Sequence, residues 1–165
     1  DRKNIEALTP VHNEVCKILS FPHDYQKRIK DELVQIFSRR LNPIVLASMP
    51  TGAGKTVLAM EFICDAYRSF EPLQQKKISI LWVVTSKELC EQSLKSFQNL
   101  WRQKGDHKVY AERFFGKFDS MSNLSESKIT FATFDKQKHL NNNDKKTSFT
   151  FVIHAFYKRG LCPGL

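Results

Sequence analysis

The sequence of 165 residues contains only four cysteines, and their spacing excludes the usual structural metal sites. Cys16, Cys64, Cys90 and Cys162 lie far apart, with no CxxC pair and no Cys/His ligand pattern. Cys64 and Cys90 fall in segments with helical patterns, where we expect them to fill space as small apolar residues rather than to bind zinc. Isolated thiols of this kind indicate a protein of a reducing cytoplasm.

Long apolar runs are also missing from the chain. None approaches the roughly 20 residues that a membrane-spanning helix needs. Residues 1–4, Asp-Arg-Lys-Asn, lack the apolar segment of a signal peptide. We therefore expect a soluble, cytoplasmic protein, or a nuclear one if the source is a eukaryote.

Acidic residues are in the minority, with 17 Asp and Glu against 26 Lys and Arg, which gives a formal net charge of +9. That balance favours an anionic partner such as nucleic acid. The basic residues are spread over several segments, as on an ordinary solvated surface, so the charge alone does not establish binding. Hydrophobic residues make up 41% of the chain, which excludes a disordered composition and suffices, at this length, for one domain with a real core.

Apolar residues recur along the chain with the periods of helices and strands. Helical spacing predicts helices over residues 24–40, 55–69 and 86–103, and a short helix over residues 11–19. Short apolar runs predict strands at residues 44–48, 78–85, 109–115, 128–134 and 149–154. Strands that alternate with helices at this spacing indicate an α/β fold with a mainly parallel sheet.

One segment carries specific chemistry. Residues 49–56 read Met-Pro-Thr-Gly-Ala-Gly-Lys-Thr and lie between an expected strand and an expected helix. A phosphate-binding loop needs this order, since the turn must bring backbone N–H groups and a helix N-terminus to one anionic group. Gly52 and Gly54 permit the tight turn. Lys55 would reach the β- and γ-phosphates, and Thr56 would ligate Mg²⁺. The strict pattern begins with glycine where this chain has Met49. The alternative, a glycine-rich turn without a ligand, is disfavoured by the flanking strand and helix.

Three further short motifs lie in order around this loop. They are Tyr25 with Gln26, residues 85–89 (Thr-Ser-Lys-Glu-Leu) with Gln92, and residues 130–134 (Thr-Phe-Ala-Thr-Phe). With these motifs the sequence resembles the first RecA-like domain of a superfamily 2 helicase or translocase, especially the group that contains restriction-enzyme motor subunits and DEAD/DEAH-type ATPases. The resemblance covers residues 21–154. It implies an α/β fold of the RecA-like P-loop NTPase type, with a mainly parallel sheet and helices on both faces. Residues 1–20 would then be an N-terminal extension and residues 155–165 an atypical tail.

The resemblance implies a site for ATP and Mg²⁺. The amide of Gln26 would offer a donor and an acceptor to the edge of the adenine, and the alternative is a solvated glutamine in the first turn of a helix. The first position of the loop is variable in the family, so Met49 is compatible with it. Lys55 and Thr56 would be catalytic, and Thr56 would be the metal ligand. The residues implied to hold the nucleotide are Tyr25, Gln26, Pro50, Thr51, Gly52, Ala53, Gly54, Lys55 and Thr56.

The resemblance also implies a nucleic-acid site, with DNA favoured over RNA. The residues implied are Thr85, Ser86, Lys87, Gln92 and Thr133. A helix N-terminus with hydroxyl groups and a lysine suits a backbone phosphate. Two plain alternatives stay open, because Thr85 and Ser86 would also cap a helix and Thr133 needs no role beyond its strand.

The next element of the family, an Asp-Glu pair after the last strand, is absent. Residues 155–165 read Ala-Phe-Tyr-Lys-Arg-Gly-Leu-Cys-Pro-Gly-Leu, and no carboxylate side chain follows Asp144. The missing Asp would hold Mg²⁺ through its hydration shell, and the missing Glu would orient the attacking water. We therefore expect the isolated chain to be deficient in ATP hydrolysis. We also expect it to stop before the acidic motif and the second RecA-like lobe, as a fragment, a frameshift product or a native short form.

Two other functions stay open. A non-catalytic nucleotide or nucleic-acid binding module would share the loop, the basic charge and the missing acidic pair. A P-loop kinase for a small molecule would need a lid, for which the sequence offers no candidate. In the family that the sequence resembles, ATP hydrolysis drives movement on nucleic acid, so the implied partners are nucleic acid and a second lobe or larger complex.

Overall fold

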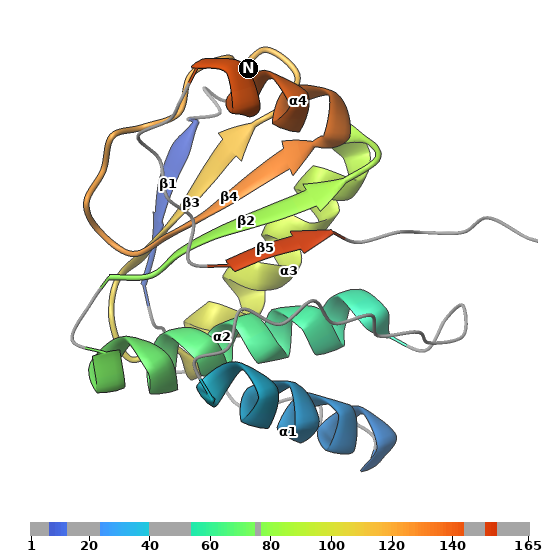
Figure 1. Cartoon of the computed structure of the whole chain (residues 1–165), viewed down its shortest axis with the longest axis vertical. Helices are drawn as coiled ribbons and strands as arrows, with labels where there is room; N and C mark the ends of the chain where they lie inside the picture. Colours follow the sequence, from blue (N-terminus) through green and yellow to red (C-terminus); the bar gives the residue numbers. More distant parts are fainter. Residues whose placement is uncertain (1–6, 13–23, 40–53, 75–76, 144–150, 155–165) are drawn as a thin grey trace, which may run out of the picture.

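The computed structural model describes residues 7–12, 24–39, 54–74, 77–143 and 151–154. Within these ranges the chain forms strands and helices in the order shown in Figure 1. They are β1 (Leu8–Val11), α1 (Asp24–Ser38), α2 (Lys55–Gln74), β2 (Ser79–Val84), α3 (Lys87–Lys104), β3 (Val109–Phe114), β4 (Lys128–Thr133), α4 (Phe134–Asn143) and β5 (Phe151–His154). None of the helices in these ranges is both long and apolar enough to cross a membrane.

The strands form one sheet in the order β1-β3-β4-β2-β5 (Figure 1). Strands β3, β4, β2 and β5 are parallel, and β1 pairs antiparallel with β3. The expected mainly parallel sheet is thus confirmed. The carboxyl ends of parallel strands meet at one edge, which is where open α/β sheets bind ligands. Strands β2 and β4 stay in register to their last residues, so Val84 lies beside Thr133. The segments that follow β2, β3 and β4 therefore begin at the same edge.

Helices cover both faces of the sheet, as expected. Helices α2 and α3 pack on one face, and α1 packs on α2 (Figure 1). Large side chains are fully buried in this core, among them Trp82, Trp101, Phe97 and Phe131. The hydroxyl of the buried Tyr67 donates to the Lys128 carbonyl oxygen at 2.6 Å. The opposite face carries a smaller apolar cluster, built by Leu81, Val83, Phe114 and Ala132 and covered by Met121, Phe134 and Leu140.

The N-terminal segment differs from the expectation. A helix over residues 11–19 is wrong at its start, because Val11 is the last residue of β1 and only 2% exposed. The expected extension thus contributes an edge strand to the sheet. The Arg113 N–H donates to the Ala7 carbonyl at 2.6 Å, and the Arg113 guanidinium donates to the Thr9 hydroxyl at 3.3 Å. These partners lie about a hundred residues away in the chain, so no local pattern could predict the strand.

Helix α2 is longer than expected. The helix was predicted over residues 55–69, but it continues through Pro72 to Gln74. Proline interrupts a helix by removing one N–H donor. The last turn is held instead by tertiary contacts, since the Glu71 carboxylate accepts hydrogen bonds from the Ser127 hydroxyl and, at 3.0 Å, from the Lys77 ammonium.

The other described helices and strands lie close to their predicted ranges, and one helix, α4, was not predicted. The expected helices over residues 24–40 and 86–103 correspond to α1 and α3, and four of the expected strands correspond to β2, β3, β4 and β5. Helix α4 was not expected, because its ten residues are mostly polar and lack a clear apolar stripe. The strand predicted over residues 44–48 and the tail at residues 155–165 lie outside the described residues.

Candidate functional site

The described part of the glycine loop forms the start of helix α2. Gly54 has a φ of +72°, in the left-handed region that favours glycine, and its carbonyl accepts a hydrogen bond from the Leu58 N–H at 2.9 Å. Lys55 is the first residue of this 20-residue helix, and Thr56 follows it. Both side chains are half-buried. The sequence-predicted residues Pro50, Thr51, Gly52 and Ala53 lie outside the described residues.

Gln26 lies directly against this loop. Its side chain, from the first turn of α1, is only 6% exposed. Its amide nitrogen lies 2.5 Å from the position that a Cβ atom would take on Gly54. A glutamine that meets the loop so closely is not the solvated residue of the alternative interpretation. The neighbouring Tyr25 is 39% exposed.

Contacts between α1 and α2 hold the two segments in place. The Lys30 ammonium pairs with the Asp65 carboxylate at 2.8 Å, and both side chains are partly buried. Burial opposes the charged form of Lys30, but the hydrogen bond and the charge of Asp65 outweigh it and raise the pKa of the lysine. Leu33 and Val34 of α1 pack against the core cluster to which α2 contributes. The position of Gln26 thus depends on tertiary packing as well as on its own helix.

The start of α3 carries the second group of predicted residues. Ser86 has extended backbone angles, and its hydroxyl accepts a hydrogen bond from the Leu89 N–H at 3.3 Å, so it caps the helix. Hydrogen bonds from the Glu88 backbone N–H and the Ser86 side chain lower the pKa of Glu88. The capping role expected as an alternative is therefore present for Ser86. Thr85 and Lys87, on either side of the cap, are exposed.

The sheet brings Thr133 to the same place. It is the last residue of β4 and pairs with Val84, directly before Thr85. Thr133 is half-buried. Gln92 lies farther along α3, with an exposed side chain and a carbonyl that accepts from the Ser96 hydroxyl at 2.9 Å. The structure thus gathers Thr85, Lys87 and Thr133 at the carboxyl edge, while Gln92 lies farther along the helix.

Residues that the sequence analysis did not select also lie at this edge. Directly after β3, Gly116 adopts a φ of +60°, and the Phe118 N–H donates to the Phe115 carbonyl at 3.1 Å. The exposed Lys117 ammonium lies 5.4 Å from the centroid of the Phe118 ring. A glycine followed by a lysine after a predicted strand was the available signal. The sequence does not show that this turn lies near the predicted site. That follows only from the strand order, which places β3 beside β4.

The donors in the described residues fit a nucleotide with Mg²⁺ better than a bound transition metal. No group of three or more His, Cys, Asp or Glu in these ranges could hold a metal ion. Cys64 and Cys90 are buried, free thiols, as expected for residues that fill space. The Thr56 hydroxyl, at the start of α2, is an oxygen donor of the kind that Mg²⁺ prefers. The left-handed Gly54 and the helix N-terminus behind it suit phosphate oxygens.

Comparisons with known proteins agree with this geometry. A family model described as "Type III restriction enzyme, res subunit" matches residues 20–154. A search of curated proteins finds no match. Among solved structures, the chain is similar to a nuclease-deletion mutant of the Type ISP restriction-modification enzyme LlaGI in complex with a DNA substrate mimic. That similarity has a TM-score of 0.60 and 16% sequence identity, and it covers 82% of this chain and 15% of the LlaGI chain. It shows a shared fold, and the present chain corresponds to a small part of that enzyme.

Proposed function

Because this chain belongs to the family of the Type III restriction enzyme res subunit and has the fold of a RecA-like, superfamily 2 motor domain, we propose that it binds ATP and Mg²⁺ at the start of α2. We further propose that it binds nucleic acid at the carboxyl edge of its sheet. The family supports a helicase-type or translocase-type ATPase domain. The residues that perform each role are part of the proposal.

The contact between Gln26 and Gly54 carries the proposal. Gln26 lies in α1 and Gly54 directly before α2, yet the Gln26 amide nitrogen lies 2.5 Å from the Cβ position of Gly54. The Gln26 amide thus occupies the space that a side chain at position 54 would take, and only glycine both fits there and adopts the left-handed φ. This contact places a donor and an acceptor for a base edge directly beside the loop proposed to hold the phosphates.

Each side chain of the ATP site has a distinct role. The Gln26 amide would read the edge of the adenine, which Tyr25 would flank. The Lys55 ammonium would act as a point charge on the β- and γ-phosphates, aided by the N-terminal dipole of α2. The Thr56 hydroxyl would orient Mg²⁺. When bound, Mg²⁺ neutralises charge on the phosphate oxygens.

Nucleic acid would bind where β2 and β4 end. Thr85 and Lys87 are exposed there, and Thr133 lies beside them through the register of the two strands. Ser86 would contribute through the helix N-terminus that it caps, and Gln92 would extend the contact along α3. The LlaGI structure contains a DNA substrate mimic, which supports DNA as the partner. The small share of LlaGI that the chain covers supports a second lobe or larger complex as a further partner.

We propose that the isolated chain binds ATP without turning it over. Strand β5 is followed by Ala155 and Phe156 where the family resemblance calls for an Asp-Glu pair. Without those carboxylates, nothing at that position would hold the hydrated Mg²⁺ or orient the attacking water. We therefore expect the isolated chain to be the ATP-binding domain of a helicase or translocase, deficient in hydrolysis.

Calorimetric titration of the whole chain with ATP and Mg²⁺ tests the nucleotide site. Lys55→Ala should weaken ATP binding by about 10- to 100-fold, because a charged hydrogen bond contributes about 1.5–3 kcal/mol. Arg68→Ala is the matched control, since it removes one exposed positive charge from the same helix and should leave the affinity unchanged.

Phosphate release, recorded in the same samples with and without nucleic acid, tests the absence of turnover. The proposed site would be rejected if Lys55→Ala left the ATP affinity unchanged, or if Arg68→Ala weakened ATP binding as much as Lys55→Ala does. Steady phosphate release that Lys55→Ala abolishes would retain the site and reject the claim of binding without hydrolysis.

A further inference from the structure

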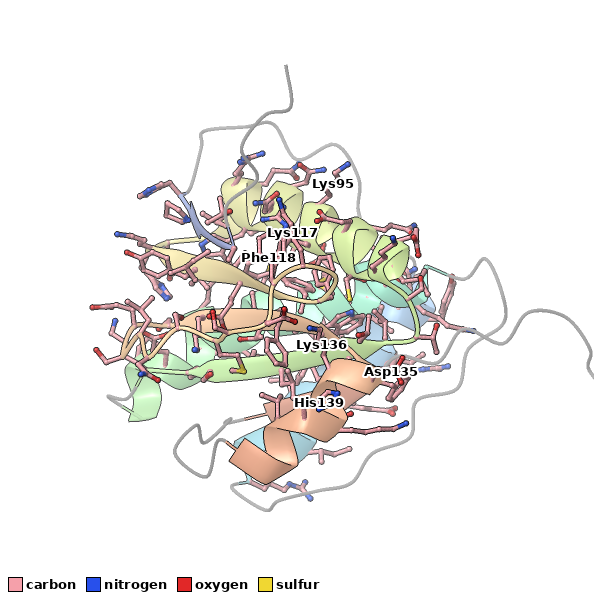
Figure 2. The ribbon with its side chains drawn as sticks, turned by 90° about the horizontal axis from the view of Figure 1, so that it is seen from above. Lys95, Lys117, Phe118, Asp135, Lys136 and His139 are labelled. Atoms are coloured by element: carbon pink, nitrogen blue, oxygen red, sulfur yellow. The ribbon has the colours of Figure 1, made fainter. Side chains whose placement is uncertain are left out.

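Three lysines follow one another from α3 to α4 in the view of Figure 2, and we call them the lysine row. Figure 2 shows Lys95 of α3, Lys117 with Phe118 in the turn after β3, and Lys136 of α4 following one another in this view. The turn starts directly after β3, and α4 starts directly after β4, so both begin at the carboxyl edge. Lys136 is three residues from Thr133, which the proposed function places on nucleic acid. The row therefore extends from the proposed nucleic-acid site.

The lysines of this row differ in their partners. Lys95 and Lys117 are exposed, and neither has an acidic partner within the described parts of the chain. The Lys136 ammonium forms an ion pair with the Asp119 carboxylate, and it also lies 5.9 Å from the centroid of the Phe114 ring. The Asp119 side chain is 75% exposed, whereas the Lys136 side chain is 23% exposed. The lysine is thus held against the protein, and its partner is an exposed anion.

An exposed anion in this position is easily replaced. Ion pairs between solvated groups contribute only about 0–1 kcal/mol, so a competing anion can break one at little cost. A backbone phosphate carries the same charge as the Asp119 carboxylate and would arrive with Lys95 and Lys117 already available on the same row. Lys136 lies in the first turn of α4, where the helix dipole favours an anion nearby.

We propose that Asp119 occupies the place of a nucleic-acid phosphate, and that a bound strand displaces it from Lys136. This inference rests on the proposed function, because it assumes nucleic acid at the carboxyl edge. Asp119 then acts as an internal competitor that weakens binding. Its release would also free the turn at residues 115–119 from α4, since the ion pair joins the two segments.

Binding of a fluorescently labelled oligothymidylate to the whole chain, measured by anisotropy over a series of salt concentrations, tests the displacement. Asp119→Asn should strengthen binding at low salt about threefold to tenfold, because the competing carboxylate is gone. Lys136→Gln should make the salt dependence shallower by about 0.7 in the log–log slope, the increment for one phosphate contact on a single strand. In a Lys136→Gln background, Asp119→Asn should have almost no effect. This dependence on Lys136 separates displacement from a general change of charge.

Helix α4, which carries Lys136, also offers a matched control for the loss of one negative charge. Asp135 and Lys138 of α4 form an exposed ion pair at 3.7 Å, with side chains 91% and 79% exposed. Asp135→Asn makes the same change of charge as Asp119→Asn at the residue directly before Lys136, and it should give a clearly smaller effect that does not require Lys136. Asp119→Ser is a second variant that removes the carboxylate with a different side chain. Circular dichroism checks that each variant is folded.

The outcomes separate this inference from the proposed function. Equal effects of Asp119→Asn and Asp135→Asn, or an effect of Asp119→Asn that persists with Lys136→Gln, would overturn the displacement. Wild-type binding that Lys87→Ala weakens, together with no effect of Asp119→Asn or Asp119→Ser, would reject the displacement and leave the nucleic-acid site standing. Absence of binding by the wild type and by both Asp119 variants would reject both.

Discussion

At the scale of single residues, Gly54 links backbone conformation to the proposed chemistry. Its φ of +72° lies in a region where an L side chain is strained, and a Cβ atom there would meet the end of the Gln26 side chain. Gly116 has a similar φ of +60°, but nothing lies within 4 Å of its Cβ position. The two glycines therefore separate backbone strain from contact with Gln26.

Gly54→Ala and Gly116→Ala should destabilise the fold equally and affect ATP binding unequally. Each forces alanine into the left-handed region, which costs about 1–2 kcal/mol. Because the Gln26 amide is the flexible end of a side chain, it can move away in Gly54→Ala, and the displacement should reduce ATP affinity rather than stability. Urea unfolding and ATP titration of both variants measure the two effects. Equal ATP affinities in the two variants would contradict a site built on Gly54 and Gln26.

At the scale of elements, a buried charged cluster attaches the segment between β3 and β4 to the sheet. Glu112 of β3 and Lys128 of β4 are only 2% and 3% exposed, and their charged groups lie 3.4 Å apart. The Glu112 carboxylate accepts from the Thr130 hydroxyl at 2.7 Å and from the Ser122 N–H at 2.5 Å, while the Lys128 ammonium donates to the Ser122 carbonyl at 2.7 Å. The backbone N–H and the backbone carbonyl of Ser122 are thus each bonded to a buried charged group.

Removing one charge of this cluster should destabilise the protein strongly. Glu112→Gln would leave the Lys128 ammonium buried without its counter-charge, and loss of one partner of a buried ion pair costs about 3–5 kcal/mol. Glu126→Gln is the control, because Glu126 pairs with Lys77 at 3.9 Å and both side chains are 53% exposed, so its loss should cost about 1 kcal/mol or less. Urea unfolding compares the two variants. A smaller loss for Glu112→Gln than for Glu126→Gln would show that the buried cluster is not what holds this segment.

At the scale of the whole molecule, two buried thiols and a buried tyrosine hydroxyl link the stability of the fold to pH. Burial raises the pKa of the Cys90 thiol to about 12, and burial also raises the pKa values of Cys64 and Tyr67. The folded state therefore favours the protonated form of each group, whereas a thiol in the unfolded chain ionises near a pKa of about 8.5. The stabilisation is complete below that value, and it is lost as the pH rises toward the folded-state pKa.

We predict that the free energy of unfolding is nearly constant around neutral pH and falls above about pH 8.5, by up to about 1.4 kcal/mol per pH unit for each buried thiol. Urea midpoints in a series of alkaline buffers measure the decline. The Cys64→Ala/Cys90→Ala variant should show a shallower decline, whatever its stability at neutral pH. An equally steep decline in this variant would assign the effect to other groups.

Much of this protein can be predicted from local patterns in the chain. Runs such as the one that forms β2, and the stripe that includes Leu94, Phe97 and Trp101 in α3, predict their elements because the period of buried residues is a local property. The order of short motifs was enough to indicate the family that residues 20–154 match. The cap at Ser86 was also predictable, because it needs contacts only three residues along the chain.

Contacts between segments that are distant in the sequence could not be predicted from such local patterns. Strand β1 depends on pairing with β3, and the last turn of α2 depends on Ser127, far from Glu71 in sequence. The meeting of Gln26 with Gly54 and that of Asp119 with Lys136 depend on how helices pack and how strands are ordered. Periodicity reports which side of an element is buried, whereas strand order and helix packing determine what that side meets. The order of motifs in the sequence therefore indicates the motor-domain family. Only the tertiary structure determines which residues of the proposed site lie together, because their contacts join segments that are far apart in the chain.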